Sequence, residues 1–106
     1  MCIRDRTHNA VGVTLVGRGA YDDALEAFNK ATAVAPGDAV GYYNLGRTYE
    51  LRSLRMLKAA GQDPLAARSL ADRDRKNAIA AFTKCVEIGG PYADKAKAAI
   101  AVLNWR

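Results

Sequence analysis

The sequence has little of the material from which catalytic and metal sites are built. Its 106 residues include one histidine, His8, and two cysteines, Cys2 and Cys85. A single histidine excludes the histidine clusters of metal sites and a histidine proton relay. Cys85 lies in the middle of an apolar stripe, where we expect a buried, unreactive thiol. No apolar run approaches the roughly 20 residues needed to cross a bilayer, so no membrane span is predicted.

The remaining candidates for chemistry also have simpler explanations. Asp22 and Asp23 are adjacent, and Asp72 and Asp74 are two apart, so each pair points to different helix faces. Helix starts and solvated surface account for these carboxylates better than acid–base catalysis does. The glycines at 17–19 lack the preceding strand and third glycine of a dinucleotide loop. We therefore expect no enzymatic activity, no bound metal and no cofactor.

The first six residues need separate treatment. Met1–Arg6 resembles a translated sequencing adapter of the kind that heads open reading frames from metagenomic assemblies. We expect this segment to be a non-native leader and leave it out of the fold argument. Cys2 then drops out of the cysteine count, and Cys85 has no internal disulfide partner. The compartment stays undetermined, because the true N-terminus need not be present.

Composition favours one helical domain over residues 7–106. Half of the residues are apolar and a quarter are charged, with only three prolines. Alanine is abundant, and the β-branched and aromatic residues form no alternating runs, which predicts an all-α fold packed through small side chains. The net charge of +5 permits an acidic partner but is too small to indicate nucleic-acid binding.

Apolar spacing and helix-breaking residues divide this domain into about five helices. Thr7 and Asp38 are suited to cap the first and third helices. Glycine and proline at 36–37, 61–64 and 89–91 mark the ends of the second, third and fourth. The predicted helices cover residues 8–18, 21–34, 39–60, 64–88 and 91–105, with the third and fourth the longest.

Two motifs recur along the chain. Gly-x-x-Leu at 12–15 returns as Gly-x-x-Tyr at 46–49. The pattern Ala-Leu-x-x-Phe-x-x-Ala at 24–31 returns at 78–85 as Ala-Ile-x-x-Phe-x-x-Cys. The second motif recurs at a larger offset than the first. The chain therefore contains two related helix pairs, and the second pair carries about 20 additional residues between its motifs.

These motifs resemble the tetratricopeptide repeat family, whose unit is a helix–turn–helix of about 34 residues. The resemblance implies a right-handed superhelical stack of antiparallel helix hairpins closed by a capping helix. In the first repeat two positions depart from the family pattern: His8 stands where an aromatic residue is usual, and Leu15 where a tyrosine is usual. Near the end of the second repeat, Gly90 stands where a proline is usual, with Pro91 one place later. The implied segments are repeat one at about 5–38, repeat two at about 39–92 with an insertion at about 53–74, and the capping helix at about 92–105.

The insertion lengthens the second hairpin. Leu54, Leu57, Leu65 and Leu70 are expected to pack inside this extension. Between residues 47 and 76 there are eight basic and four acidic residues, so this region carries most of the net charge. Two interpretations stay open: a solvated hairpin surface, or a docking face for an acidic protein segment.

The family resemblance also implies a concave groove lined by the first helix of each repeat. A groove of mixed aromatic, apolar and charged side chains suits an extended peptide or a partner helix. We therefore expect a non-catalytic protein–protein interaction scaffold whose partner is a protein or peptide. The alternative is a structural or self-associating fragment of a larger array. The groove positions are Asn9, Val13, Val16, Tyr43, Arg47 and Glu50.

Overall fold

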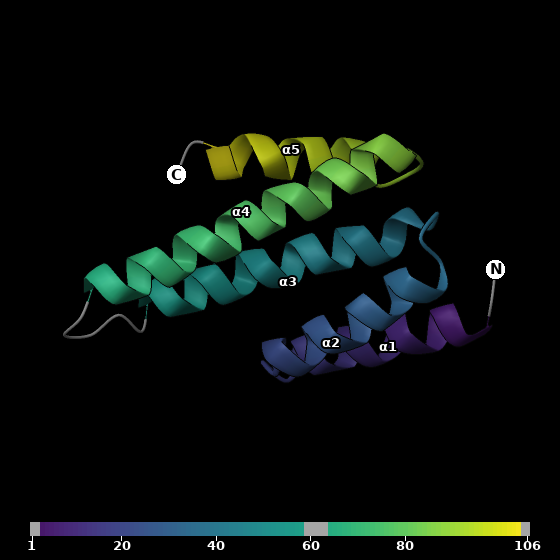
Figure 1. Cartoon of the computed structure of the whole chain (residues 1–106), viewed down its shortest axis with the longest axis horizontal. Helices are drawn as coiled ribbons and strands as arrows, with labels where there is room; N and C mark the ends of the chain where they lie inside the picture. The colour runs from purple at the N-terminus through teal and green to yellow at the C-terminus, as the bar shows by residue number, and fades with distance from the viewer. Residues whose placement is uncertain (1–2, 59–63, 105–106) are drawn as a thin grey trace.

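The computed structural model describes residues 3–58 and 64–104, and this part of the chain contains five α-helices and no strand (Figure 1). The all-α class predicted from the sequence is confirmed. No helix within these ranges is both long and apolar enough to cross a membrane. The helices are α1 (Ile3–Gly17), α2 (Tyr21–Val34), α3 (Ala39–Lys58), α4 (Pro64–Ile88) and α5 (Ala93–Asn104).

The helix bounds agree with the sequence prediction where the stop signals are strong. Both α2 and α4 have the predicted limits, and Asp38 caps α3 by accepting a hydrogen bond of 3.0 Å from the Val40 amide. The predicted start of α1 is wrong, because the helix begins at Ile3 and Thr7 lies inside it. No glycine or proline interrupts residues 3–6, so a helix can extend through them. The stop signal at 61–63 lies outside the described residues.

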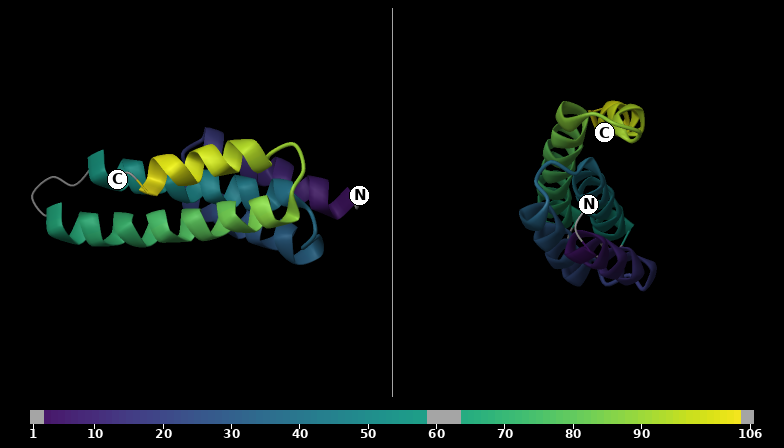
Figure 2. Two further views of the ribbon diagram at one scale, coloured as in Figure 1. Left: turned by 90° about the horizontal axis from the view of Figure 1, so that it is seen from above. Right: turned by 90° about the vertical axis from the view of Figure 1, so that its right-hand side faces the viewer.

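The helices form antiparallel hairpins that pack side by side in a slab of 46 × 26 × 18 Å. Seen end on, α1, α3 and α5 lie toward one side and α2 and α4 toward the other (Figure 2). Each helix packs against its neighbours in the chain, and α1 also packs against α3. The α3–α4 hairpin extends beyond the ends of α1, α2 and α5 (Figure 1).

In each of the two hairpins, α1–α2 and α3–α4, a glycine of the first helix faces a phenylalanine ring of the second helix. A β-carbon on Gly12 would lie 2.3 Å from Cε1 of Phe28, and one on Gly46 would lie 2.6 Å from Cε1 of Phe82. Both distances are far below van der Waals contact, so only glycine lets the phenylalanine ring approach the facing helix. This explains a glycine in the middle of a helix despite its poor helix propensity.

Two apolar clusters form the core, one between α2 and the α3–α4 hairpin and the other between that hairpin and α5. Tyr42 and Tyr49 of α3 are half-buried and pack against both clusters, so they join the two halves of the molecule. The first cluster consists of Ala24, Leu25, Phe28, Leu45 and Ala81. The second consists of Ala39, Ala78, Phe82, Cys85, Ala96 and Leu103.

The leucines of the hairpin extension do not form the internal packing that the sequence predicted. Leu57 and Leu70 are exposed, and Leu65 has an exposed fraction of 78%. Only Leu54 is partly buried. The physical reason is geometric: this end projects past α1, α2 and α5, so α3 and α4 have no third helix there to cover an apolar face.

Candidate functional site

An open, mostly apolar cavity of about 250 Å³ lies between α1 and α3. Four of the six predicted groove residues line it: Val13 and Val16 from α1, and Tyr43 and Arg47 from α3. Their spacing of three and four residues places each pair on one helix face, and the packing of α1 against α3 brings the two faces together. The other lining residues are Phe28, Asn44, Thr48 and Leu51.

The two remaining predicted residues lie outside the cavity lining. Asn9 accepts a hydrogen bond from the side-chain amide of Asn44, with a nitrogen-to-oxygen distance of 3.4 Å. This contact joins α1 to α3 beside the cavity. Glu50 is buried, with an exposed fraction of 5%, and it does not line the cavity. Its carboxylate is paired with the guanidinium of Arg47 one helical turn away, and the Arg47 side chain covers it.

Tyr43 is held in place by aromatic neighbours. Its ring lies 5.7 Å from that of Phe82 and 4.9 Å from that of Tyr92, centroid to centroid, and both pairs are tilted. One side of Tyr43 therefore packs against the second apolar cluster, although the sequence analysis named Tyr43 only as a groove position. The other side lines the cavity, so the tyrosine is a rigid part of the cavity wall.

Sequence reasoning did not assign Asn44, Thr48 and Leu51 to the groove. The signal for them was present, because they continue the α3 face of Tyr43 and Arg47 at helical spacing. Thr48 is fixed by a hydrogen bond of 2.8 Å from its hydroxyl to the backbone oxygen of Asn44. The cavity thus combines apolar walls with the half-exposed guanidinium of Arg47.

Comparisons with protein-family models, with curated proteins and with solved structures gave no significant match.

No group of three or more His, Cys, Asp and Glu side chains that could hold a metal ion occurs within residues 3–58 and 64–104. Cys85 is fully buried in the second apolar cluster, as predicted. Burial raises the pKa of its thiol, because the thiolate would be poorly solvated there. The thiol is therefore held in its less reactive form.

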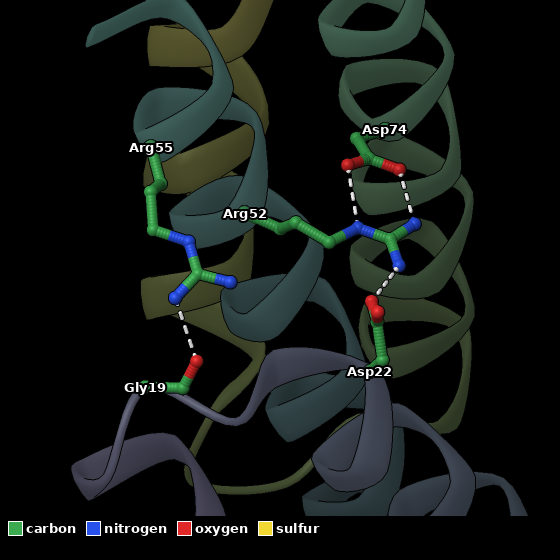
Figure 3. A network of polar contacts seen from close by, with 5 residues as sticks. All are labelled: Gly19, Asp22, Arg52, Arg55 and Asp74. Carbon is green, nitrogen blue, oxygen red and sulfur yellow. Dashed lines mark hydrogen bonds and ion pairs between the residues drawn. The ribbon is translucent and has the colours of Figure 1, made fainter. Parts of the chain in front are cut away.

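Arg52 connects three helices through two carboxylates (Figure 3). Its Nε and Nη2 donate hydrogen bonds of 2.8 and 2.6 Å to Asp74 of α4, and its Nη1 donates one of 2.7 Å to Asp22 of α2. The hydrogen bonds to Asp74 make the largest contribution to a raised pKa of Arg52, and the bond to Asp22 raises it further. Asp74 has an exposed fraction of 2%, so its predicted place on a solvated surface is wrong. The bidentate pairing satisfies the carboxylate and permits its burial.

Other arginines of the α3–α4 region are also bound within the molecule. Arg55 donates a hydrogen bond of 2.7 Å to the backbone oxygen of Gly19 (Figure 3). Its guanidinium carbon also lies 4.2 Å from the centroid of the Tyr21 ring. Arg75 donates one of 3.3 Å to the backbone oxygen of Leu103 near the end of α5. Half of the eight basic residues in this region therefore have intramolecular partners, which leaves less positive surface for an acidic ligand than the sequence suggests.

Proposed function

We propose that this chain is a non-catalytic scaffold of the tetratricopeptide repeat type, which binds a peptide or helix of a partner protein between α1 and α3. The observation that carries the proposal is the cavity itself. It is open, its walls are apolar, and Val13, Val16 and Tyr43 line it together with the half-exposed Arg47. Its volume of about 250 Å³ is large enough for one bulky side chain.

The repeat assignment is supported by contacts that recur in both hairpins. The Gly12–Phe28 and Gly46–Phe82 contacts are equivalent, and the two glycines are one repeat length apart in the sequence. The first helices of the hairpins lie together on one side of the molecule, and the second helices lie on the other (Figure 2). A right-handed superhelical twist and a capping role for α5 belong to this proposal.

The chemistry of the cavity indicates what the partner presents. Apolar walls favour an aliphatic or aromatic side chain as the anchor. The net charge of +5 favours a carboxylate next to that anchor, because an acidic segment is attracted before contact. The proposed ligand is therefore a protein segment with a bulky apolar residue beside Asp or Glu, and not nucleic acid.

A peptide-display selection against the full chain provides the ligand for the test. We expect Val13→Asp and Arg47→Glu each to weaken the selected peptide about ten-fold or more, a loss of about 1.4 kcal/mol. Arg73→Glu, a charge reversal at an exposed position outside the cavity, is the matched control and retains affinity. Far-UV circular dichroism checks that all three variants keep their helicity. Equal affinity of the wild type and both cavity variants would overturn the groove proposal.

A second candidate function is a structural, self-associating subunit that uses the end of the α3–α4 hairpin. The exposed leucines Leu57, Leu65 and Leu70 favour it, because three large apolar side chains near one end of a hairpin are a potential contact surface. Light scattering separates the two functions. Concentration-dependent oligomers that disappear in a Leu57→Ser/Leu65→Ser variant would support self-association through the hairpin.

A further inference from the structure

A cavity of about 130 Å³ lies where α3, α4 and the end of α5 meet. It shares no lining residue with the cavity between α1 and α3. Its walls are apolar at Leu57 of α3, Ala71 of α4 and Leu103 of α5. Two arginines of α4, Arg68 and Arg75, also line it. We refer to this cavity as the arginine pocket.

The guanidinium of Arg75 is incompletely bonded. Its Nη1 donates a hydrogen bond of 3.3 Å to the backbone oxygen of Leu103. Its Nε is buried and makes no hydrogen bond, and it is the only buried side-chain nitrogen or oxygen within residues 3–58 and 64–104 without one. Buried polar atoms in folded proteins are nearly always bonded, so an unpaired one in the wall of a cavity is evidence for a ligand there.

A carboxylate already lies near this nitrogen. Asp72, one helical turn before Arg75, also lines the pocket, and its Oδ1 is 3.7 Å from the Arg75 Nε. That distance is too long for a hydrogen bond, and the Asp72 side chain has an exposed fraction of 57%. In the Arg52 pair the corresponding Nε donates to the carboxylate of Asp74 at 2.8 Å. Asp72 therefore marks a place that attracts a carboxylate, but it does not satisfy the nitrogen.

Arg68 is the second cation of the pocket. It lies two helical turns before Arg75, so both arginines are on one face of α4. Arg68 is exposed, and no ion pair or hydrogen bond joins its side chain to any residue that the structure describes. Together with Asp72, the two arginines leave the pocket with a net positive charge. A carboxylate, which carries a single negative charge, neutralises it.

We propose that the arginine pocket binds a carboxylate group carried on a short apolar stem. The carboxylate displaces that of Asp72, accepts a hydrogen bond from the Nε of Arg75 and pairs with Arg68. The stem contacts Leu57 and Leu103. The cavity has the volume of about four water molecules, which is room for a carboxylate and about two or three carbon atoms. The proposal does not depend on the groove function.

Nuclear magnetic resonance of the ¹⁵N-labelled full chain tests the proposal, because the Nε–H signal of each arginine responds to its own partner. Titration with butyrate, a carboxylate with a short alkyl stem, should shift the signals of Arg68 and Arg75 to saturation. Arg73, an exposed arginine of α4 that does not line the pocket, should not respond. Butyramide, which has nearly the same shape without the charge, and sodium chloride of equal ionic strength should have no such effect. No saturable shift, or equal shifts with butyramide or at Arg73, would overturn the proposal.

Substitutions of the lining residues provide the second measurement. Arg75→Gln should weaken butyrate binding about ten-fold, because a hydrogen bond between charged groups is lost. Since this change also removes the bond to Leu103, Arg68→Gln serves as a variant that loses no internal bond, and it should weaken binding about three-fold. Asp72→Asn should strengthen binding about two-fold or more, because it removes the competing carboxylate. Arg73→Gln is the matched control and retains the affinity.

A damaged fold cannot produce the gain expected for Asp72→Asn. Unchanged affinity in both Arg68→Gln and Asp72→Asn would contradict the proposed site even if Arg75→Gln lost binding. Far-UV circular dichroism checks the helicity of each variant.

The carboxylate has two sources with the same chemistry: a free short-chain acid, or a glutamate side chain of a partner protein. Butyrate represents the first, and a Gly-Glu-Gly peptide with blocked ends represents the second. Both should shift the same arginine signals, and the one that does so at the lower concentration identifies the source. Inorganic phosphate, an oxyanion without a stem, should bind more weakly than either. Tighter binding of phosphate would overturn the assignment to a carboxylate.

Discussion

Arg52 binds two carboxylates of very different exposure. Asp74 is buried and bound through two hydrogen bonds, whereas the side chain of Asp22 is mostly solvent-exposed. An ion pair that is accessible to water contributes little to stability, because water solvates the separated charges nearly as well. Removing one member of a buried pair is costly, because the other loses its compensation.

We therefore predict that Asp74→Ala lowers the free energy of unfolding by about 3 kcal/mol. Asp22→Ala, which removes the exposed partner of the same arginine, should lower it by less than about 1 kcal/mol. Urea denaturation followed by circular dichroism measures both. Similar losses for the two variants would show that burial does not decide the strength of these pairs.

Gly12 and Gly46 each have a phenylalanine ring where a β-carbon would be. Gly12→Ala and Gly46→Ala should each destabilise the fold by about 1 to 3 kcal/mol, because the phenylalanine ring has to move to make room for the new methyl group. These losses are measured relative to Gly17→Ala, a glycine-to-alanine change at a position where the methyl group meets no neighbouring side chain. Gly17 ends α1, and no atom lies within 4 Å of the place a β-carbon would take, so alanine there should be neutral or stabilising. Thermal melts of the three variants test this difference.

Cys85 provides a prediction on pH. Burial raises its thiol pKa in the folded chain above the value of about 8.5 that holds in the unfolded chain. Above that pH the unfolded chain binds fewer protons than the folded chain, so stability should fall as pH rises. The difference in unfolding free energy between the wild type and Cys85→Ala should accordingly decrease between pH 8 and pH 10. If this difference in unfolding free energy did not change with pH, the thiol would have the same pKa in the folded and the unfolded chain, which would contradict its burial.

At the scale of the helices, the α3–α4 hairpin contains two differently packed parts. Near α1, α2 and α5 its apolar residues are buried, whereas Leu57, Leu65 and Leu70 near its free end are exposed. Serine in place of Leu65 or Leu70 should change the free energy of unfolding by less than about 0.5 kcal/mol. Leu45→Ala, in the covered part, should cost about 2 to 4 kcal/mol. A loss above about 1 kcal/mol for Leu65→Ser would indicate that the hairpin end is packed in solution.

The sequence predicts helices well where strong local signals bound them. The bounds of α2 and α4 follow from Gly19, Pro36, Pro64 and the glycines at 89–90, because each of these residues has few conformational alternatives or a backbone conformation that ends a helix. The start of α1 was missed because Thr7 is also a good capping residue, and local preference alone cannot choose between a cap and a helix interior.

Burial of charge was harder to predict, because it depends on partners distant in sequence. Asp74 lies in a segment that is polar on all sides, and only Arg52, in a different helix, makes its burial favourable. Four of the predicted groove residues, from α1 and α3, line the cavity, because their positions follow the helical spacing of the repeat. Glu50 does not line it, because its carboxylate is buried and paired with Arg47. A contact of this kind is decided by side-chain geometry, which periodicity does not contain.

At the scale of the whole molecule, α1 has two exposed faces that differ in their surroundings. One faces α3 across the cavity that contains Val13, and the other carries Val11 and has no helix of the described chain over it. Peptide binding is proposed at the first face.

The most direct test of the groove proposal is an amide chemical-shift map of the ¹⁵N-labelled chain titrated with the peptide selected by display. We expect the largest shifts to fall on residues of the cavity, including Val13, Val16, Tyr43 and Arg47. Largest shifts at the hairpin leucines or on the outer face of α1, with the cavity residues unmoved, would contradict it.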